Sequence, residues 1–272
     1  MLSKNQIKRI NSLQQKKYRN KTGLFIVEGE KSVREFLESR FELESLFYLE
    51  DGNGKWEDQR QKTEDGRQKT EDSKLRHSEL VPESYKKQNH SNFFPVSLKE
   101  LQKISALKNA NTVLAVFKIP KPFKIIDKGL ILVLDDIKDP GNLGTIIRLC
   151  DWFGVQQLVC SLETVDCYNP KVVQASMGSL TRVPVVYTNL ENYLSSTTLP
   201  IYTSLLAGEN VYQTTLKNSA ILVMGNEANG ISDAIQHFAT HQLNIPHFGK
   251  IAQTESLNVA MATAVLLSEF RR

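Results

Sequence analysis

The 272-residue sequence lacks the long apolar run that a membrane-spanning helix needs. Its longest apolar stretches, such as Leu130–Leu134 and Ile221–Met224, have only the length of a strand. The first residues, Met-Leu-Ser-Lys, lead into no apolar core of the kind found in a secretory signal. We therefore expect a cytoplasmic protein that does not enter a membrane.

Cysteine is also scarce, since the sequence has three cysteines and no Cys-x-x-Cys spacing. An odd number without that spacing argues against a disulfide framework and against a metal site, so we expect reduced thiols and no metal. No Gly-x-Gly-x-x-Gly turn follows any expected strand. That absence disfavours a nicotinamide-dependent oxidoreductase and a Rossmann-type methyltransferase that acts on proteins or small molecules.

Neither sign of charge is in large excess, because the formal net charge is only +4. The cations nevertheless gather near the N-terminus, where Ile7, Ile10 and Leu13 recur at helical spacing. This pattern predicts a helix with its apolar side buried and its cations outside. A solvated helix face and an RNA-contacting face both fit it. The cations are Lys4, Lys8, Arg9, Lys16, Lys17, Arg19 and Lys21.

Residues 51–92 are poor in aliphatic side chains and contain a tandem repeat, Glu57–Thr63 followed by Glu64–Thr70. A segment so short of apolar residues cannot offset its ordering entropy by burial. We expect a flexible polar insertion inside the first domain. A coiled coil is excluded because every position of the repeat is polar and no apolar seam exists.

Strands and helices alternate from Leu130 onward, which is typical of an α/β fold with parallel strands. Pro120 and Pro122 indicate a linker. We expect an RNA substrate-binding domain over residues 1–118, a linker over 119–127 and a second domain over 128–272. The expected strands are Leu24–Val27, Leu43–Leu49, Thr112–Phe117, Leu130–Leu134, Gln157–Cys160, Val183–Tyr187, Ile201–Leu205 and Ala220–Met224. The expected helices are Glu30–Ser39, Ser97–Ile104, Leu143–Phe153, Lys171–Met177 and Ser256–Phe270.

Three segments interrupt this pattern with glycine, asparagine and acidic residues: Leu134–Arg148, Ile221–Ile231, and Leu243–Gly249 together with Thr254–Ala262. Ligands of open α/β sheets bind outside the carboxyl ends of the strands, so these segments are candidates for a site.

Each segment also has a purely structural explanation. Asn142 could be the N-cap of a helix, and Ser256 could cap the last helix. Gly225 and Gly230 could serve an ordinary strand-to-helix turn. Asn258 lies among apolar neighbours and needs a hydrogen-bond partner if it is buried. Taken singly, no segment decides between structure and function.

Together and in this order, the segments resemble motifs 1, 2 and 3 of the SpoU (TrmH) RNA methyltransferases. The matching runs are Asp-Pro-Gly-Asn-Leu-Gly-x-x-x-Arg at 139–148, Met-Gly-Asn-Glu-x-x-Gly-Ile at 224–231, and Ile-Pro-x-x-Gly at 245–249 followed by Glu-Ser-Leu-Asn-Val-Ala at 255–260. Lys16–Lys31 resembles the substrate-binding domain that is often fused to them. The resemblance covers the chain except for the repeat.

The resemblance implies an N-terminal L30e-like α/β/α domain and a C-terminal SPOUT α/β domain with a deep trefoil knot. It implies a homodimer through the C-terminal domain, with the last helix in the interface. It also implies S-adenosylmethionine as the cofactor, bound in a bent form largely by backbone groups. The implied cofactor-binding residues are Met224, Gly225, Glu227, Ile245, His247, Ser256 and Leu257.

The implied reaction is methyl transfer to a ribose 2′-hydroxyl of RNA, with Asn142, Arg148, Glu227, Ser256 and Asn258 as the catalytic set. The family proposal makes the residue at 148 the base. An arginine stays protonated in proteins, so we favour a cationic Arg148 that stabilises the developing alkoxide. In this hypothesis Glu227 orients Arg148, and Asn142 holds the ribose or the arginine.

The sequence departs from the family pattern at His247, where methionine is common, and in a longer loop over 249–255. The resemblance favours ribosomal RNA over transfer RNA, with Lys8, Arg9, Lys16 and Arg19 as RNA contacts. The alternative from another class is a non-catalytic RNA-binding protein that retains the methyltransferase fold. The intact catalytic set disfavours it.

Overall fold

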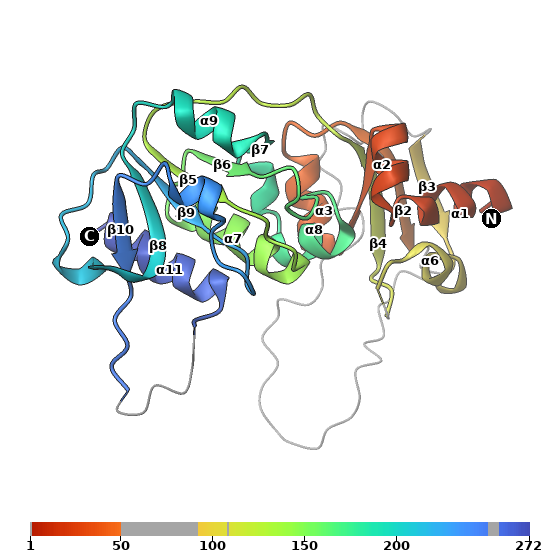
Figure 1. The fold of residues 1–272 in the computed structure, drawn as a ribbon. Coiled ribbons are helices and arrows are strands. Elements are labelled where there is room, and N and C mark those ends of the chain that lie inside the picture. The colour runs from red at the N-terminus through yellow and green to blue at the C-terminus, as the bar shows by residue number, and fades with distance from the viewer. Residues whose placement is uncertain (1, 50–91, 108, 250–255) are drawn as a thin grey trace, which may run out of the picture. The chain divides into compact units, whose positions relative to one another are not determined.

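The structure, a computed structural model, describes residues 2–49, 92–107, 109–249 and 256–272. The chain divides into two compact units, Met1–Ile119 and Pro120–Arg272, which we call the N-terminal unit and the C-terminal unit. Each unit is built on a sheet of its own (Figure 1). The repeat and most of the expected insertion at 51–92 lie outside the described residues, as do residues 250–255 of the long loop.

The N-terminal unit has a four-stranded sheet in the order β1-β4-β2-β3. Strand β4 runs antiparallel to both β1 and β2, and β3 runs parallel to β2. The sequence analysis assigned no strand at β3, which contains Pro95. Proline is tolerated there because β3 is an edge strand. The strands are β1 (Leu24–Glu28), β2 (Leu43–Leu49), β3 (Phe93–Val96) and β4 (Val113–Lys118).

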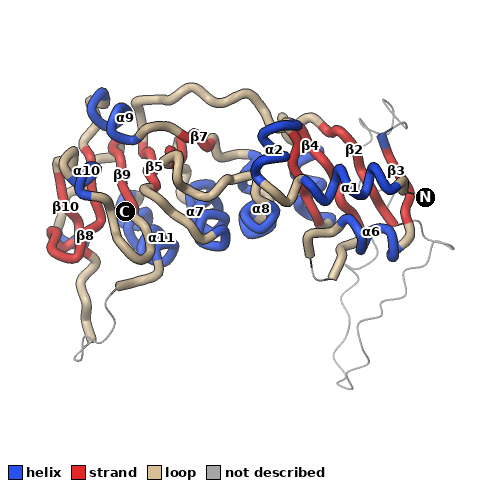
Figure 2. Tube along the Cα trace, turned by 45° about the vertical axis from the view of Figure 1, so that its right-hand side comes forward, coloured by secondary structure: helices blue, strands red, loops and turns tan. Residues whose placement is uncertain are grey.

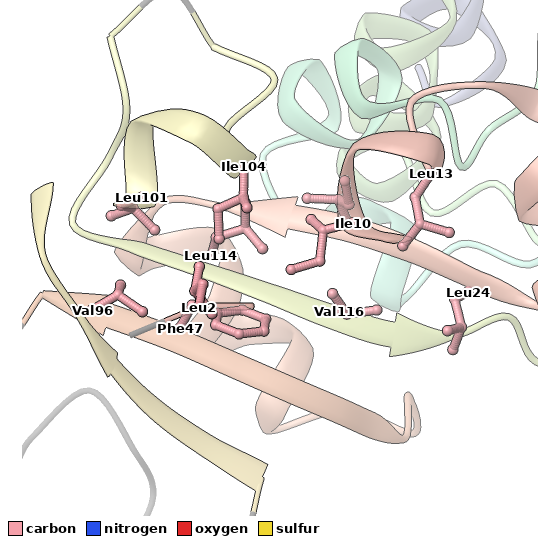
Figure 3. Close-up of a cluster of buried hydrophobic side chains, with 11 residues drawn as sticks. Leu2, Ile10, Leu13, Leu24, Phe47, Val96, Leu101, Ile104, Leu114 and Val116 are labelled. Atoms are coloured by element: carbon pink, nitrogen blue, oxygen red, sulfur yellow. The ribbon is translucent and has the colours of Figure 1, made fainter. Parts of the chain in front are cut away.

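Helices α1 (Lys4–Ser12) and α6 (Leu98–Ile104) cover one face of this sheet (Figure 2). Ser3 and Ser97 begin these two helices, each with a capping box. The expected apolar side of the first helix is confirmed, because Ile10 and Leu13 are buried. The core beneath the helices is shown in Figure 3 and includes Ile10, Leu13, Phe47, Leu101, Ile104, Leu114 and Val116.

Helix α3 (Glu30–Leu37) packs on the opposite face through an aromatic cluster. The rings of Phe25 and Phe36 meet edge to face with their centroids 5.7 Å apart, and Phe117 lies 5.4 Å from Phe36. The sheet is therefore covered on both faces, with the short helix α2 (Lys16–Thr22) leading into β1.

The C-terminal unit has a six-stranded sheet in the order β10-β8-β9-β5-β6-β7, and all of its neighbouring strands are parallel. The central strands are apolar along their whole length, as expected when both faces of a parallel sheet are buried. The strands are β5 (Leu130–Leu134), β6 (Gln157–Cys160), β7 (Val185–Tyr187), β8 (Ile201–Asn210), β9 (Ala220–Met224) and β10 (His241–Asn244).

The helices of this unit lie on opposite sides of the sheet (Figure 1). On one face, alternate residues of β5 and β9 such as Ile131 and Ile221 pack with Leu194 of α9 and Ile235 of α10. On the other, α7 packs against α8 and α11. The helices are α7 (Pro140–Trp152), α8 (Pro170–Ser176), α9 (Leu190–Ser196), α10 (Asp233–Gln236) and α11 (Val259–Phe270).

The strand order changes direction between β5 and β9. The chain leaves β5 for β6 on one side, whereas it leaves β9 for β10 on the other. Such a point opens a crevice at the carboxyl ends of the two strands, where ligands of α/β sheets bind. Two of the three segments singled out in the sequence follow these strands.

In the C-terminal unit, the sequence also gave no indication of α9, α10 and β10. Within the part of the chain that the structure describes, no helix has the length and apolar character to cross a bilayer.

Candidate active site

The three candidate segments are joined by hydrogen bonds centred on Asn142. Its side-chain nitrogen Nδ2 donates to Oε1 of Glu227, at 2.8 Å, in the loop after β9. Its oxygen Oδ1 accepts from Nδ2 of Asn258, at 3.0 Å, just before α11. These residues are far apart in the chain, so the fold brings one residue of each segment into a single chain of hydrogen bonds. We call Glu227, Asn142 and Asn258 the site triad.

Asn142 is free to make these bonds because it does not cap its helix, and the sequence interpretation of Asn142 as an N-cap is wrong. Helix α7 begins at Pro140, and the carboxylate of Asp139 accepts from the backbone nitrogen of Asn142 at 2.7 Å. An Asp followed by proline at the first helical position is a good helix start, because proline has the right φ and needs no donor.

Asn258 has two roles, and the structural interpretation of Ser256 as the cap of the last helix is also wrong. The Asn258 oxygen Oδ1 accepts from the backbone nitrogens of Ala260 and Met261, at 2.9 and 3.4 Å, so Asn258 is the N-cap of α11. Its nitrogen is left to donate to Asn142. Ser256 lies before the helix and is exposed. One amide therefore fixes the start of α11 and its place beside α7.

Helices α7 and α11 are tied at their other ends as well. The guanidinium of Arg271 donates to the backbone carbonyls of Phe153, at 2.6 Å, and Gly154, at 2.7 Å. A cation at a helix C-terminus also complements the helix dipole. The two helices thus run in the same direction with hydrogen bonds at both ends, which holds the Asn142–Asn258 contact in register.

Gly225 begins a tight loop over residues 225–231. A Cβ atom at Gly225 would lie 2.2 Å from the carbonyl carbon of Gly230, so no other residue fits without moving the loop. Asn226 and Gly230 exchange two backbone hydrogen bonds of 2.9 Å, and Gly230 has a φ of +70°. The loop is therefore closed on itself, and Glu227 projects from it.

The remaining expected cofactor residues leave the same edge of the sheet. Met224 is buried at the end of β9, and Ile245 follows β10 and is half-buried. Parallel strands end at a common edge of the sheet, so the segments that follow β9 and β10 both leave the sheet at that edge. His247 and Leu257 are exposed, and Nδ1 of His247 accepts from the backbone nitrogen of Gly249 at 3.1 Å.

Arg148 is exposed on α7 and makes no ion pair or hydrogen bond with the described residues. The carboxylate expected to orient it, Glu227, instead accepts from Asn142. Trp152 lies one turn further along and is 84% exposed, so the face of α7 that carries Arg148 is open to a partner.

The residues expected to contact RNA differ in accessibility. Lys8, Arg9 and Lys16 are exposed, and Arg9 pairs with Glu44 at 2.9 Å. Arg19 is only 1% exposed, and its guanidinium donates to the carbonyls of Leu13 and Gln14 at 2.9 and 3.0 Å. The prediction that Arg19 contacts RNA is therefore wrong, because the buried guanidinium satisfies the carbonyls between α1 and α2.

The described residues do not support metal binding or catalysis by a cysteine nucleophile. No group of three or more His, Cys, Asp or Glu side chains is placed to hold a metal ion in residues 2–49, 92–107, 109–249 and 256–272. The three cysteines are free and buried. Burial raises the pKa of the Cys150 and Cys160 thiols, so neither is a ready thiolate nucleophile at neutral pH.

Comparisons with known protein families divide the chain at a similar place. The SpoU rRNA Methylase family model matches residues 129–268. The model of the MRM3-like substrate binding domain matches residues 4–115. The chain is 28% identical over 274 aligned residues to the Bacillus subtilis 23S rRNA (guanosine(2553)-2′-O)-methyltransferase RlmP, covering 99% of this chain and 97% of that relative.

Two solved structures are similar over almost the whole chain. One is described as a candidate RNA methyltransferase of the TrmH family from Porphyromonas gingivalis, with 34% identity, a TM-score of 0.80, and 99% and 98% of the two chains covered. The other is an AdoMet-bound rRNA methyltransferase from Sinorhizobium meliloti, with 25% identity, a TM-score of 0.80, and 100% and 95% covered.

Proposed function

The chain belongs to the SpoU rRNA methylase family, and we propose that it transfers a methyl group from S-adenosylmethionine to a ribose 2′-hydroxyl of ribosomal RNA. The observation that carries this proposal is the site triad. Asn142, Glu227 and Asn258 come from the three motifs of the family and meet at the carboxyl ends of β5 and β9. An enzyme that aligns two substrates needs such fixed side chains, because misalignment costs rate steeply.

The cofactor would be held by Met224, Gly225, Glu227, Ile245, His247, Ser256 and Leu257. The residues present fit this group. The loop at Gly225 is closed by two backbone hydrogen bonds, the exposed Leu257 side chain offers an apolar surface, and the exposed Glu227 carboxylate complements a cationic ligand. When bound, the cofactor supplies an electrophilic methyl group on a sulfonium.

Arg148 is the residue that would act on the reacting oxygen. The guanidinium keeps its proton, so Arg148 stabilises the developing alkoxide and holds the adjacent phosphate; it does not act as a base. Its open face on α7 suits this role, because a substrate can reach it. Asn142 would position the ribose, held in turn by Glu227 and Asn258. Ser256 completes the proposed set before α11.

The N-terminal unit would bind the RNA through Lys8, Arg9 and Lys16, which are exposed on α1 and α2. Cations that neutralise phosphates supply salt-dependent affinity without reading sequence. The relative RlmP is named for 23S rRNA, which favours ribosomal RNA over transfer RNA as the substrate. Such an enzyme works in the cytoplasm, where three buried free cysteines are stable.

We further propose an L30e-like N-terminal domain, a deep trefoil knot around β9 and β10, and a homodimer through the C-terminal unit. Support for the dimer comes from large apolar side chains that solvent reaches on α7 and α11. Trp152 is 84% exposed and Met261 63% exposed. Exposed apolar surface of this kind is typical of a protein contact.

The experiment is methyl transfer from tritiated S-adenosylmethionine to unmodified transcripts of 23S ribosomal RNA and of transfer RNA, followed by alkaline hydrolysis. A methylated 2′-oxygen cannot attack the neighbouring phosphate, so we expect tritium in alkali-resistant dinucleotides from the ribosomal transcript. Tritium in mononucleotides would instead show base methylation. A chain that binds RNA but transfers no methyl group to any transcript would be the non-catalytic RNA-binding protein.

A further inference from the structure

The loop over residues 225–231 is held in its conformation by hydrogen bonds within the loop, and other hydrogen bonds attach it to the sheet. Its two-residue bridge between Asn226 and Gly230 closes the turn. The Asn226 oxygen Oδ1 accepts from the backbone nitrogens of Ala228 and Asn229, at 2.8 and 3.1 Å. These bonds fix the form of the loop, and none of them joins it to β5.

Two consecutive residues at the end of β5 supply that position. The Asp135 carboxylate oxygen Oδ2 accepts from the backbone nitrogen of Ser232, at 2.8 Å, and from its hydroxyl, at 2.7 Å. The backbone carbonyl of Asp136 accepts from Nδ2 of Asn226 at 2.7 Å. Both ends of the loop are thus tied to the neighbouring strand.

The local structure is specialised for these contacts. Asp136 has a φ of +60°, which a residue with a side chain rarely adopts. It is the backbone carbonyl of this same residue that accepts the hydrogen bond from Asn226. Asp135 is only 8% exposed. A buried carboxylate must be satisfied, and Ser232 provides two donors to a single oxygen of it. Hydrogen bonds to an ionised acceptor are about twice as strong as neutral ones.

We propose that Asp135 and Ser232 form a clamp that positions the loop of residues 225–231 for S-adenosylmethionine, without touching the cofactor themselves. This inference rests on the proposed function, which assigns Met224, Gly225 and Glu227 to the cofactor. The clamp also sets where Glu227 projects, and therefore where it meets Asn142. Asp135 and Ser232 are positioning residues of this site.

The test is isothermal titration of the full chain with S-adenosylmethionine, beside thermal unfolding. Ser232→Ala removes one of the two donors, and Asp135→Asn removes the charge of the acceptor. We expect the dissociation constant to rise about fivefold in Ser232→Ala and about tenfold in Asp135→Asn, the net scale of one lost hydrogen bond. Ser232→Thr keeps the hydroxyl and therefore the hydrogen bond to Asp135. We expect its dissociation constant for S-adenosylmethionine to stay within about twofold of the wild-type value.

Asp127→Asn is the matched control. This carboxylate of the same unit also accepts from hydroxyl groups, those of Thr197 and Thr198 after α9, but Asp127 lies just before β5, whereas the loop of residues 225–231 follows the carboxyl end of β9. Because Asp127 is exposed whereas Asp135 is buried, Asp127→Asn should lower the melting temperature less than Asp135→Asn does, and it should leave cofactor affinity unchanged. If Asp135→Asn fails to fold, the comparison of Ser232→Ala with Ser232→Thr still tests the clamp.

Two failures are distinguishable. Wild-type binding together with unchanged affinity in Ser232→Ala would overturn the clamp and leave the proposed function standing. A wild-type chain that binds no S-adenosylmethionine would overturn the proposed function on which the clamp rests.

Discussion

The candidate residues of the two units are held in different ways. In the C-terminal unit, Asn142, Glu227 and Asn258 are fixed by hydrogen bonds to one another. In the N-terminal unit, Lys8 and Lys16 are exposed on α1 and α2, and the most tightly held cation, Arg19, is buried and serves the fold. Methyl transfer requires aligned groups, whereas attraction to phosphates requires only accessible charge. The difference is what we expect from the proposal that the C-terminal unit performs the chemistry and the N-terminal unit contributes affinity.

The largest effect that this division predicts is on Arg148. Arg148→Ala should reduce the single-turnover rate of methyl transfer by about a hundredfold or more, the scale of one lost electrostatic stabiliser. Binding of S-adenosylmethionine should be retained, because Arg148 lies outside the cofactor-binding set. Arg148→Lys keeps the charge without the planar fork and should recover only part of the rate. Near-normal turnover of Arg148→Ala would remove Arg148 from the catalytic set.

The next effect contrasts two kinds of cation in the N-terminal unit. Arg19→Met should lower the free energy of unfolding by about 2 kcal/mol, because it leaves the buried carbonyl of Leu13 and the partly buried carbonyl of Gln14 without their charged donor. Lys16→Met, at an exposed position three residues earlier in α2, is the matched control and should change the free energy of unfolding by less than about 0.5 kcal/mol. Urea denaturation of both variants measures the difference. Equal stabilities would mean that Arg19 is not a structural cation.

A smaller effect separates the two roles of Asn258. Asn258→Ala loses the N-cap of α11 and should lower the free energy of unfolding by about 1 kcal/mol. Asn258→Asp keeps a good cap and replaces the donor to Asn142 with an oxygen. Calorimetry should find Asn258→Asp as stable as wild type, while its methyl transfer is about tenfold slower, on the scale of one lost hydrogen bond. Full activity of the Asn258→Asp enzyme would mean that Asn258 serves only as the N-cap of α11.

The smallest effect concerns pH and stays within the N-terminal unit. Hydrogen bonds from the backbone nitrogens of Ser97 and Leu2 lower the pKa of Glu100 to about 2. A lowered folded-state pKa means that the ionised carboxylate stabilises the fold above the ordinary value of 4.5 and that this stabilisation is lost as the pH falls toward 2. Glu100→Gln should therefore melt below wild type at pH 6, and the two curves should converge near pH 2. The exposed Glu38→Gln is a control, and a gap that persists at pH 2 would argue against this account.

The sequence predicted the C-terminal unit well, because its motifs combine special residue types in a fixed order. The prediction of the SpoU family from those runs is confirmed by the family match. The start of α7 was misplaced because Asn142 and Asp139 are both good caps, and only the hydrogen bond from the Asn142 backbone to Asp139 distinguishes them. The Asp-Pro pair was the signal that identifies the true start.

Other features gave no usable signal. Strand β10 has a single buried residue, Leu243, so it shows no alternating pattern. The burial of Arg19 follows from the turn between α1 and α2, which a run of similar cations cannot reveal. The clamp of Asp135 on Ser232 joins residues 97 positions apart, and neither belongs to a recognised run. Such contacts depend on which strands become neighbours.

The most direct test of the division between the units is one single-turnover experiment over a series of RNA concentrations. It compares wild type with a variant in which Lys8, Arg9 and Lys16 are changed to Gln, and with Arg148→Ala. The charge variant should need more RNA, with a flatter dependence of binding on salt, yet reach the wild-type rate at saturation. Arg148→Ala should reach saturation at near-normal RNA concentrations with a rate about a hundredfold lower. A charge variant that stays slow at saturating RNA, or an Arg148→Ala variant restored by added RNA, would contradict the account.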